Sequence, residues 1–474
     1  MIRNSASLSR WWSAQIHFGL VLGWVLHLPT AVAQPGTLDT SFDPGSGVDQ
    51  SVFAMAVQDD GRIIIVGDFT TVNGIPRGGI ARLSNNGALD TNFNSGSGAN
   101  DLVNAVALQT NKTVIAGYFT EIDGTPRGRI ARLNSNGSLD TNFAAGPGAS
   151  GPVLALAIQA DGKVVVGGVF TNVQGTARTN IARLNSDGSA DTGFNPGTGV
   201  SSPNPASVKA IALQTDGKII LGGAFTSVNG TVHTNLARLN SDGSVDGSFN
   251  PSATGGGVLA GVNTLAVQSD GRIVVGGDFT GINGMAKKNI ARLNANGTLD
   301  TNFLAGLGPD DAVSSLAVQS NGKIVLGGYF NYVNAAARTN VARLNSDGSL
   351  DSAFTPGAGT DYPVYVTALQ SDGQVLIGGL FATFDATPRS GIARLNGDAI
   401  IPSPQLLSPV RSNNTFRVSL ATSSGHAYVL EYKNVLTNGN WSEILPSVAG
   451  DGTVKTLTDS SATGPQRMYR VRVD

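Results

Sequence analysis

The feature that most constrains the fold of this chain is a repeat of about fifty residues. The triplet Ala-Arg-Leu recurs with spacings of 50, 51, 55, 54, 51 and 51 residues between successive copies. A fixed period in this range indicates one supersecondary unit that is repeated and packed against its neighbours. The seven arginines are Arg82, Arg132, Arg183, Arg238, Arg292, Arg343 and Arg394.

Each copy contains four strand-like runs. In the third copy they are VLALAIQ, KVVVGGVF, NIARLN and SADTGF, and the turns ADG and SDG join the first two and the last two. Short loops that contain glycine are typical of antiparallel hairpins. Four antiparallel strands per repeat predict the blade of a β-propeller, and therefore an all-β fold.

The order of the runs predicts that the ring is closed. The fourth run carries Asp-x-x-Phe in seven copies, but this series is shifted by one strand. The segment GTLDTSF near residue 36 is a fourth strand without a blade, and the last repeat stops after IARLN without a fourth strand. Pairing the two completes a seven-bladed propeller over residues 34–400 and removes its open sheet edges.

The consensus of the copies resembles a known repeat family. It is V-x-A-[LIV]-A-[LIV]-Q-x-[DN]-G-[KR], then G-G-x-F, then I-A-R-L-N-x-[DN]-G-x-x-D-x-x-F. This pattern resembles the delta-60 repeats of bacterial secreted proteins over roughly Gly36 to Asn396. The resemblance implies a propeller outside the cytoplasm, and it implies no catalytic residues because that family has no assigned function. The second copy departs at Thr110-Asn111-Lys112, which lacks the hairpin glycine.

The turn between the third and fourth strands predicts a charge pair in each blade. In the third copy, the loop Ser186-Asp187-Gly188 places Arg183 opposite Asp191. The same register pairs Arg394 with Asp39, but only if the ring closes. The other expected pairs are Arg82 with Asp90, Arg132 with Asp140, Arg238 with Asp246, Arg292 with Asp300, and Arg343 with Asp351.

Residues 1–33 are predicted to be a secretory signal peptide. Arg3 and Arg10 precede an apolar run from Ile16 to Leu28, and Ala31-Val32-Ala33 is a small-residue cleavage motif. An uncleaved anchor is the alternative, although the run is short for the roughly 20 residues that span a bilayer. Cleavage near Ala33/Gln34 would leave a mature chain without a membrane span that is secreted, periplasmic or displayed at the cell surface.

The composition changes after the last repeat. Residues 401–405 begin with Ile401-Pro402-Ser403-Pro404 and are expected to be a linker. Residues 406–474 contain four runs that alternate apolar and polar side chains, as half-buried strands do. Their pattern, Y-x-L-E-Y-x…W…G-D-G…Y-R-V-R-V, is similar to the small β-sandwich modules that end many bacterial surface proteins.

Candidate binding residues lie in the connectors between the second and third strands and between blades, which we expect to form one long-loop face. A basic residue precedes the third strand in every copy. These residues could form a ring that attracts an acidic polymer, but their strict repetition favours a structural role, in which each side chain bonds the carbonyls of its own loop. Tyr362 and Tyr365 lie beside Asp310, Asp311 and Asp361, where an acidic-aromatic sugar site could form, and Tyr332 is a further candidate on this face. The propeller has no tryptophan, however, and solvated loop residues are the favoured interpretation. The basic positions are Arg77, Arg127, Arg178, His233, Lys287, Arg338 and Arg389.

Groups for catalysis or metal binding are scarce. After cleavage the only histidines are His233 and His426, and Glu121 is the only glutamate in the propeller, so a histidine triad is not expected. The chain has no cysteine, which excludes disulfides and thiolate metal sites. The turns N-x-[DN]-G-x-x-D match half of a calcium loop, and simple glycine turns are the favoured interpretation. If calcium binds, the better candidates are Asp187/Asp191 and Asp242/Asp246.

These features favour a monomeric, non-enzymatic interaction scaffold that binds an extracellular protein or polysaccharide and needs no cofactor. A secreted glycan-active enzyme is the first alternative, and a purely structural part of a surface protein is the second. Removing Arg3 and Arg10 changes the formal net charge from −2 to −4, which argues against nucleic acid as a partner.

Overall fold

The computed structural model of the chain describes residues 33–144, 146–256, 261–398, 406–422, 427–434, 441–450, 453–462 and 467–473. The predicted signal peptide, except Ala33, and the predicted linker lie outside these residues. All elements in the described part of the chain are β-strands. None of the described residues forms a helix long and apolar enough to span a bilayer.

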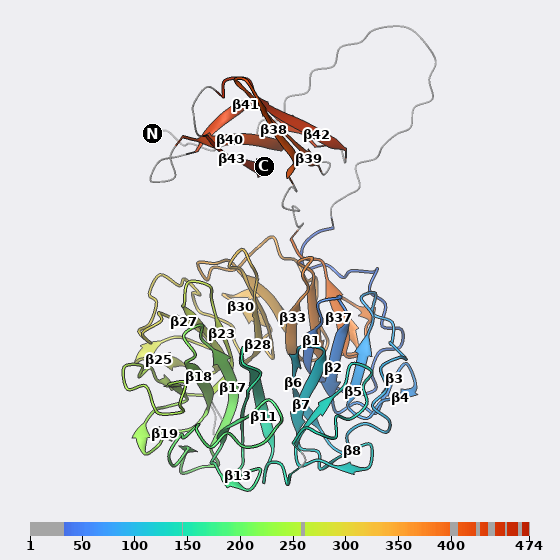
Figure 1. The fold of residues 1–474 in the computed structure, drawn as a ribbon. Coiled ribbons are helices and arrows are strands. Elements are labelled where there is room, and N and C mark those ends of the chain that lie inside the picture. The colour runs from blue at the N-terminus through green and yellow to red at the C-terminus, as the bar shows by residue number, and fades with distance from the viewer. Residues whose placement is uncertain are drawn as a thin grey trace. The chain divides into compact units, whose positions relative to one another are not determined.

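Each repeat forms a three-stranded antiparallel sheet in chain order. Figure 1 shows the innermost strands around the centre of the ring. These innermost strands are β1 (Val52–Val57), β6 (Val103–Gln109), β11 (Val153–Ile158), β17 (Ser207–Leu213), β23 (Gly261–Val267), β28 (Val313–Val318) and β33 (Val364–Leu369). The middle strands are β2 (Ile63–Gly67), β7 (Lys112–Gly117), β12 (Val164–Gly168), β18 (Ile219–Ala224), β24 (Ile273–Asp278), β29 (Ile324–Gly328) and β34 (Val375–Gly379). The third strands are β5 (Ile80–Leu83), β10 (Ile130–Leu133), β15 (Ile181–Leu184), β21 (Leu236–Leu239), β27 (Ile290–Leu293), β32 (Val341–Leu344) and β37 (Ile392–Leu395).

The fourth run of each repeat is shorter than the sequence predicts. It pairs with the third strand through a single bridge, such as Leu184 with Ala190. The aspartate that follows the bridge ends the pairing, because it starts a turn. In the first Asp-x-x-Phe copy, Asp39 Oδ1 accepts from the backbone N–H of Ser41 and the N–H of Phe42 donates to Asp39 O. The chain therefore leaves the sheet after one pair.

A small hairpin between the second and third strands covers the outer edge of each blade. In the fifth blade, Asn283 at the hairpin tip donates from Nδ2 to Gly297 O, in the turn after β27, over 3.0 Å. The hairpins lie on the circumference of the ring (Figure 1). These connectors therefore do not form the long-loop face that the sequence predicted. They fold back over the open edge that the short fourth run leaves on each blade.

The hairpin strands are β3 (Thr71–Val72) with β4 (Ile75–Pro76), β8 (Glu121–Ile122) with β9 (Thr125–Pro126), β13 (Asn172–Val173) with β14 (Thr176–Ala177), β19 (Ser227–Val228) with β20 (Thr231–Val232), β25 (Gly281–Ile282) with β26 (Met285–Ala286), β30 (Tyr332–Val333) with β31 (Ala336–Ala337), and β35 (Thr383–Phe384) with β36 (Thr387–Pro388). The connector from the preceding blade pairs with each hairpin, for example Val48 with Val72. In the fourth and fifth blades these connectors form the strands β16 (Val200–Ser201) and β22 (Ala253–Thr254).

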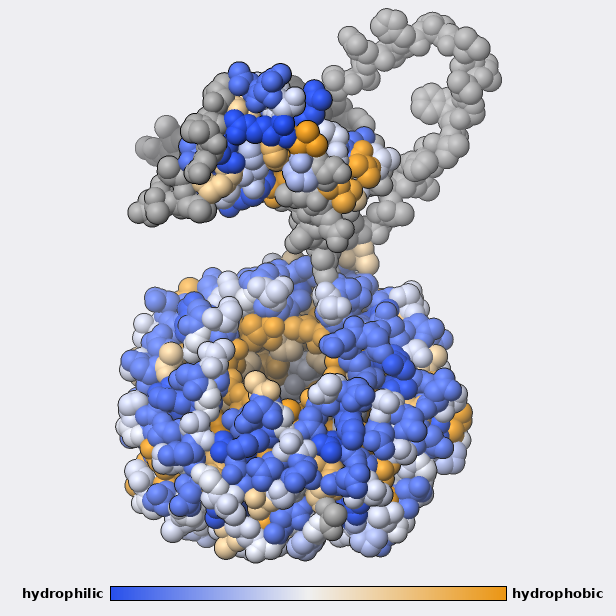
Figure 2. All heavy atoms as spheres, viewed as in Figure 1, coloured by the Kyte–Doolittle hydropathy of each residue, from blue (hydrophilic) through white to orange (hydrophobic). Residues whose placement is uncertain are grey.

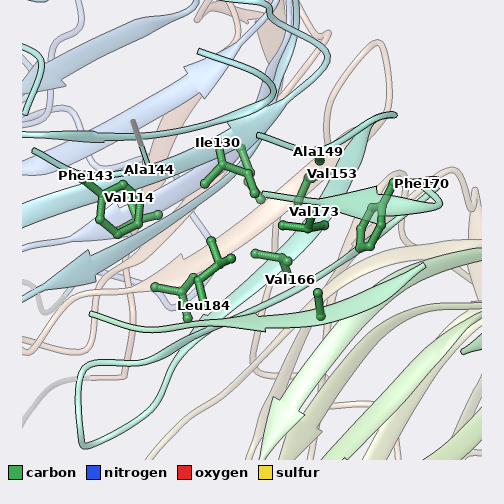
Figure 3. Close-up of a cluster of buried hydrophobic side chains, with 14 residues drawn as sticks. Val114, Ile130, Phe143, Ala144, Ala149, Val153, Val166, Phe170, Val173 and Leu184 are labelled. Atoms are coloured by element: carbon green, nitrogen blue, oxygen red, sulfur yellow. The ribbon is translucent and has the colours of Figure 1, made fainter. Parts of the chain in front are cut away.

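The hydrophobic core lies between neighbouring blades. Figure 3 shows Ile130 and Phe143 of the second blade packed with Val153 and Val166 of the third. Glycine in the middle strand is required for this close approach: a Cβ on Gly167 would lie 2.5 Å from Cγ1 of Val208 in the next blade. Burial of each such valine stabilises the ring by about 1.5–3 kcal/mol.

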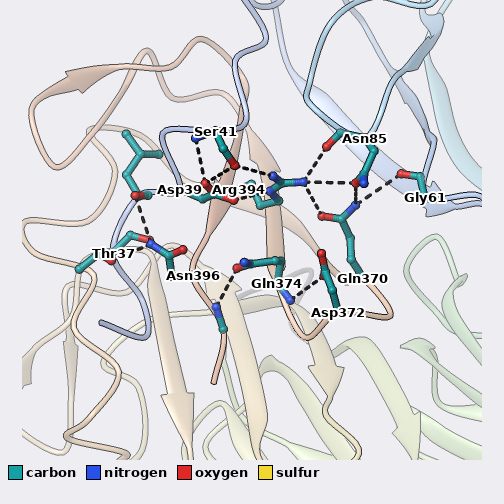
Figure 4. A network of polar contacts seen from close by, with 12 residues as sticks. Thr37, Asp39, Ser41, Gly61, Asn85, Gln370, Asp372, Gln374, Arg394 and Asn396 are labelled. Atoms are coloured by element: carbon teal, nitrogen blue, oxygen red, sulfur yellow. Dashed lines mark hydrogen bonds and ion pairs between the residues drawn. The ribbon is translucent and has the colours of Figure 1, made fainter. Parts of the chain in front are cut away.

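The N-terminal segment closes the ring, as the sequence predicts. Gly36 N donates to Asn396 O over 2.7 Å, Leu38 bridges Leu395, and Asp39 N donates to Arg394 O over 2.8 Å. Figure 4 shows the polar contacts around this junction. The seventh blade thus obtains its fourth run from the opposite end of the repeat array.

Residues 406–473 contain two three-stranded antiparallel sheets. Side chains of both sheets, including Val418, Leu430 and Leu457, share one core, and Phe416 stacks on Tyr469 with ring centroids 3.8 Å apart. This is the small sandwich that the alternating runs predict, with two more strands than those runs indicated. The strands are β38 (Leu406–Ser412), β39 (Thr415–Ala421), β42 (Val454–Asp459), and β41 (Ser442–Ala449), β40 (Ala427–Lys433), β43 (Met468–Val473).

Candidate functional site

The innermost strand of every blade has a β-bulge near its start. In β1 the register with β2 shifts between Val52 and Ala54, so Phe53 is the extra residue. A bulge re-aims the side chain of the extra residue, here at the beginning of the strand that borders the channel. We call these seven residues the inner mouth residues: Phe53, Asn104, Leu154, Lys209, Asn263, Ser314 and Tyr365.

A second set of residues lies at the same end of the blades, where the middle strand ends. Each member precedes the phenylalanine of G-G-x-F, and four of them have large, exposed apolar side chains: Tyr118, Val169, Tyr329 and Leu380. We call this set the outer mouth residues: Asp68, Tyr118, Val169, Ala224, Asp278, Tyr329 and Leu380. Figure 2 shows a hollow at the centre of the ring with a wall that is largely coloured as hydrophobic.

Three aromatic rings form a continuous wall at this mouth. The ring centroids of Tyr329 and Tyr365 are 5.9 Å apart, and those of Tyr365 and Phe53 are 5.8 Å apart. The successive ring planes are inclined by 46° and 45°, as expected of side chains on consecutive blades of a ring. We call these three residues the aromatic wall.

The two tyrosines of the aromatic wall also carry polar groups. Burial, and then the neighbouring Tyr329 hydroxyl and the charge of Asp68, raise the pKa of Tyr365 to about 12. The hydroxyl of Tyr365 is therefore protonated at neutral pH, and it lies near that of Tyr329. The aromatic wall thus combines apolar faces with hydroxyl groups at its edge.

The fourth and fifth blades contribute polar residues to the mouth. Lys209 Nζ donates to Asn263 Oδ1 over 3.3 Å. Burial lowers the pKa of Lys209, and the charge of Asp278 opposes this shift. Among the inner and outer mouth residues the charged side chains are Asp68, Asp278 and Lys209, so the mouth carries one more negative than positive charge.

The seven basic positions do not form an exposed ring. Arg77 and Arg127 are each 8% exposed, and His233 is 2% exposed. Arg127 donates from Nη1 to Pro126 O and from Nη2 to Thr141 O. These contacts are those of the favoured structural interpretation, in which the side chain holds its own loop. Arg178, Lys287, Arg338 and Arg389 are half-buried, and the three arginines among them donate to carbonyl groups of the residues before them.

The structure places the predicted tyrosines on three different segments. Tyr332 is 50% exposed in the outer hairpin strand β30, Tyr362 is 56% exposed in a connector, and Tyr365 lies in the aromatic wall. The nearby carboxylates have structural partners: Asp310 accepts from the N–H groups of Asn331 and Tyr332. Asp361 holds the next hairpin in the same way, through Ala382 and Thr383, and Asp311 accepts from the N–H of Ala312.

The arginines of Ala-Arg-Leu connect neighbouring blades. Arg183 Nε lies 2.7 Å from Asp191 Oδ2, and its Nη1 donates to Ser241 O in the next blade. The guanidinium also lies over the Phe194 ring, 4.7 Å from its centroid. All seven expected arginine–aspartate pairs have contacts between 2.7 and 2.9 Å, including Arg394 with Asp39.

A second cation at the same aspartate was missed from the sequence. In six blades the basic residue that follows the first hairpin turn contacts it, as Lys163 Nζ does with Asp191 Oδ2 at 3.0 Å. The signal was present in the [KR] of the repeat consensus. The seventh blade has Gln374 there, and its side chain accepts from the N–H of Gly397.

The calcium candidates do not have the geometry of a metal site. Asp187 Oδ1 accepts from the N–H and the hydroxyl of Ser189, whereas Asp191 pairs with Arg183 and Lys163. Asp242 and Asp246 repeat this arrangement. The described residues contain no group of three histidine, cysteine, aspartate or glutamate side chains that could hold a metal ion.

No curated protein matches the chain. Among solved structures, it is similar to a protein of unknown function from Bacteroides caccae, with 13% sequence identity and a TM-score of 0.33; the match covers 58% of this chain and 91% of that one. A family model described as a domain of unknown function (DUF5122) beta-propeller matches residues 58–93, 108–143, 159–194, 214–249, 268–303, 319–354 and 370–398. These seven segments make up more than half of the 474 residues, and the chain therefore belongs to the DUF5122 β-propeller family, of which the delta-60 repeat is an example.

Proposed function

We propose that this protein is a non-enzymatic binding scaffold, secreted or displayed at the cell surface, and that its ligand docks at the channel mouth. The ligand is an extracellular protein or polysaccharide. The observation that carries the proposal is the aromatic wall formed by Phe53, Tyr329 and Tyr365.

The repeat itself supplies an internal comparison. The position of Tyr365 is occupied by Asn104 in the second blade and by Ser314 in the sixth, and that of Tyr329 by Asp68 in the first. Blades with these residues form the same three-stranded sheets. Folding of a blade therefore does not require an aromatic side chain at the mouth, and the contacting rings on three consecutive blades support a binding role.

The enzymatic alternative requires a general acid, and the carboxyl groups of one cleft can be compared with this requirement. A cleft of about 700 Å³ between the fifth and sixth blades contains Asp270 and Asp347. Hydrogen bonds from Arg272 lower the pKa of Asp270, and those from Ser349 lower the pKa of Asp347. A general acid needs a raised pKa at neutral pH, so neither carboxyl group of this cleft is suited to that role.

The proposal is tested by retention on immobilised extracellular material from the source culture, separated into polysaccharide and protein fractions. We expect one fraction to retain the purified protein and to release no product during incubation. Replacing Tyr329 and Tyr365 by alanine should abolish retention. Retention that is unchanged in this double variant, or a new product in the supernatant, would contradict the proposal.

A further inference from the structure

We propose that the channel mouth binds an uncharged polysaccharide, with pyranose rings stacked on the aromatic wall. This inference rests on the proposed function and specifies the ligand class at the same site. It is carried by three properties of the mouth: the arrangement of the rings, the hydroxyl groups beside them, and the charge.

The aromatic wall offers ring faces to a ligand. Tyr329 is 45% exposed, and Phe53 and Tyr365 are half-buried. The negative face of an aromatic ring attracts the positively polarised C–H groups that a pyranose presents on its apolar side. Because neighbouring rings are inclined to each other by 46° and 45°, the three rings do not share one plane, and they suit a coiled chain or a chain end better than a flat ribbon.

Hydroxyl groups accompany the aromatic wall on the same blades. Tyr329 and Tyr365 contribute phenolic hydroxyls at the mouth. Hydroxyl groups both donate and accept, so this sector can exchange hydrogen bonds with the hydroxyls of a sugar.

The charge of the mouth favours an uncharged polymer over a polyanion. Asp68 and Asp278 outnumber Lys209 among the mouth residues, and Lys209 already donates to Asn263. The basic residues that could attract an acidic polymer are on the outer rim, where Arg77 and Arg127 are buried. A polyanion would therefore meet net repulsion at the aromatic wall.

A glycan is also favoured over a protein partner. Protein interfaces concentrate binding energy in aromatic side chains that are inserted into a complementary surface over a large contact area. Here two of the three rings, Phe53 and Tyr365, are half-buried at the start of the innermost strands. A slender chain reaches half-buried rings more easily than a folded protein does.

The test is affinity electrophoresis of the purified protein in gels that contain one soluble polysaccharide each: mixed-linkage β-glucan, arabinoxylan, galactomannan, pullulan or polygalacturonate. We expect retardation by at least one of the four uncharged polymers. Tyr329→Ala and Tyr365→Ala should each weaken the apparent affinity at least tenfold, whereas Tyr329→Phe, which keeps the ring, should retain most of it.

Tyr332→Ala is the matched control, because this tyrosine is similarly exposed but lies in the outer hairpin strand β30. Its mobility should equal that of the unmodified protein in every gel, and equal melting temperatures of all variants would show that the fold is intact. Retardation only by polygalacturonate, by no polymer, or equally in the Tyr329→Ala and Tyr365→Ala variants would overturn the inference. If the extracellular protein fraction still retained the chain through the mouth, only the glycan inference would fail.

Discussion

The arginine of Ala-Arg-Leu combines three contacts that each depend on its planar guanidinium. Arg394 pairs with Asp39 through Nε, donates to Asn85 O through Nη1 and lies over the Phe42 ring. Although burial alone would raise the pKa of Asp39, hydrogen bonds from Ser41 and the charge of Arg394 lower it. The pair is thus a buried, fully bonded ion pair that joins residues 355 positions apart.

The first prediction concerns this pair. Asp39→Ala and Arg394→Ala should each lower the free energy of unfolding by about 3–5 kcal/mol, because each leaves a buried charge without its partner. The double variant should lose much less unfolding free energy than the sum of the losses in the two single variants. Urea unfolding of the unmodified protein, the two single variants and the double variant gives the coupling free energy of the pair. Additive effects would show that the pair does not hold the ring closed.

His233 occupies the position where the other six blades have arginine or lysine. It is 2% exposed, and neither ring nitrogen has a hydrogen-bond partner in the described part of the chain. Burial lowers the pKa of His233 below its ordinary value of 6.5. The unfolded chain therefore takes up a proton before the folded chain does, and this site destabilises the fold as the pH falls below 6.5.

The second prediction is that the melting temperature falls between pH 7 and pH 5 because of His233. His233→Arg, which introduces the residue found at Arg178, should reduce this fall. His233→Gln, which cannot titrate, should reduce it as well and separates the charge effect from new arginine contacts. A profile that is the same in all three proteins would assign the pH dependence to other groups.

At the scale of the element, the closing segment is held to the third strand β37 by a single bridge and a few hydrogen bonds. Without this segment, β37 has a free edge.

The third prediction is that deletion of residues 36–43 lowers the melting temperature markedly or causes aggregation, because an unpaired strand edge templates association. Light scattering and thermal unfolding provide the measurement. A chain that lacks only Ala33 and Gln34 is the control, and equal stability of the two truncations would contradict the closing role.

The sequence predicted the elements that depend on local pattern, and failed where tertiary contacts decide. Turn chemistry and alternation were sufficient for the three regular strands and for the register that sets Leu184 opposite Ala190. The fourth run was predicted as a full strand because SADTGF contains no glycine or proline before its turn. Asp191 shortens it by accepting the N–H of Gly193, and a side-chain cap of this kind is not visible in alternation.

At the scale of the whole molecule, the candidate site likewise divides into residues that the local sequence pattern predicted and residues that only the tertiary fold brings together. Tyr365 was found as a candidate, but the aromatic wall was missed because it joins Phe53 and Tyr365, which are more than 300 positions apart, across the closed ring. The available signal was the variable position of V-x-A in the repeat. Only the bulge reveals that this position borders the channel. The structural role of the basic residues was the favoured prediction, because their repetition is strict, and their carbonyl contacts agree with it.

The seven aspartates of the Asp-x-x-Phe turns couple the whole ring to pH. Burial opposes ionisation of each one, but hydrogen bonds and the charges of neighbouring arginines and lysines lower every pKa below the ordinary value of 3.8. For a carboxyl group with a lowered pKa, the stabilisation is complete well above 3.8 and is lost as the pH falls through and below that value, since the unfolded chain binds protons first.

The last prediction is that acid unfolding of the propeller is steep and cooperative. Each additional proton bound by the unfolded chain changes the free energy of unfolding by about 1.4 kcal/mol per pH unit. The seven aspartates all shift in the same direction, so together they give a slope of up to about seven protons as the pH falls below 3.8. Urea midpoints measured from pH 7 to pH 3 provide that slope. The measurements use the His233→Gln chain, so that protonation of His233 does not contribute to the slope. Asp140→Asn should reduce the uptake by one proton and also lower stability at pH 7, because the amide no longer balances Arg132 and Lys112. A slope below about two protons would mean that the arginine–aspartate pairs are too exposed to hold the blades together.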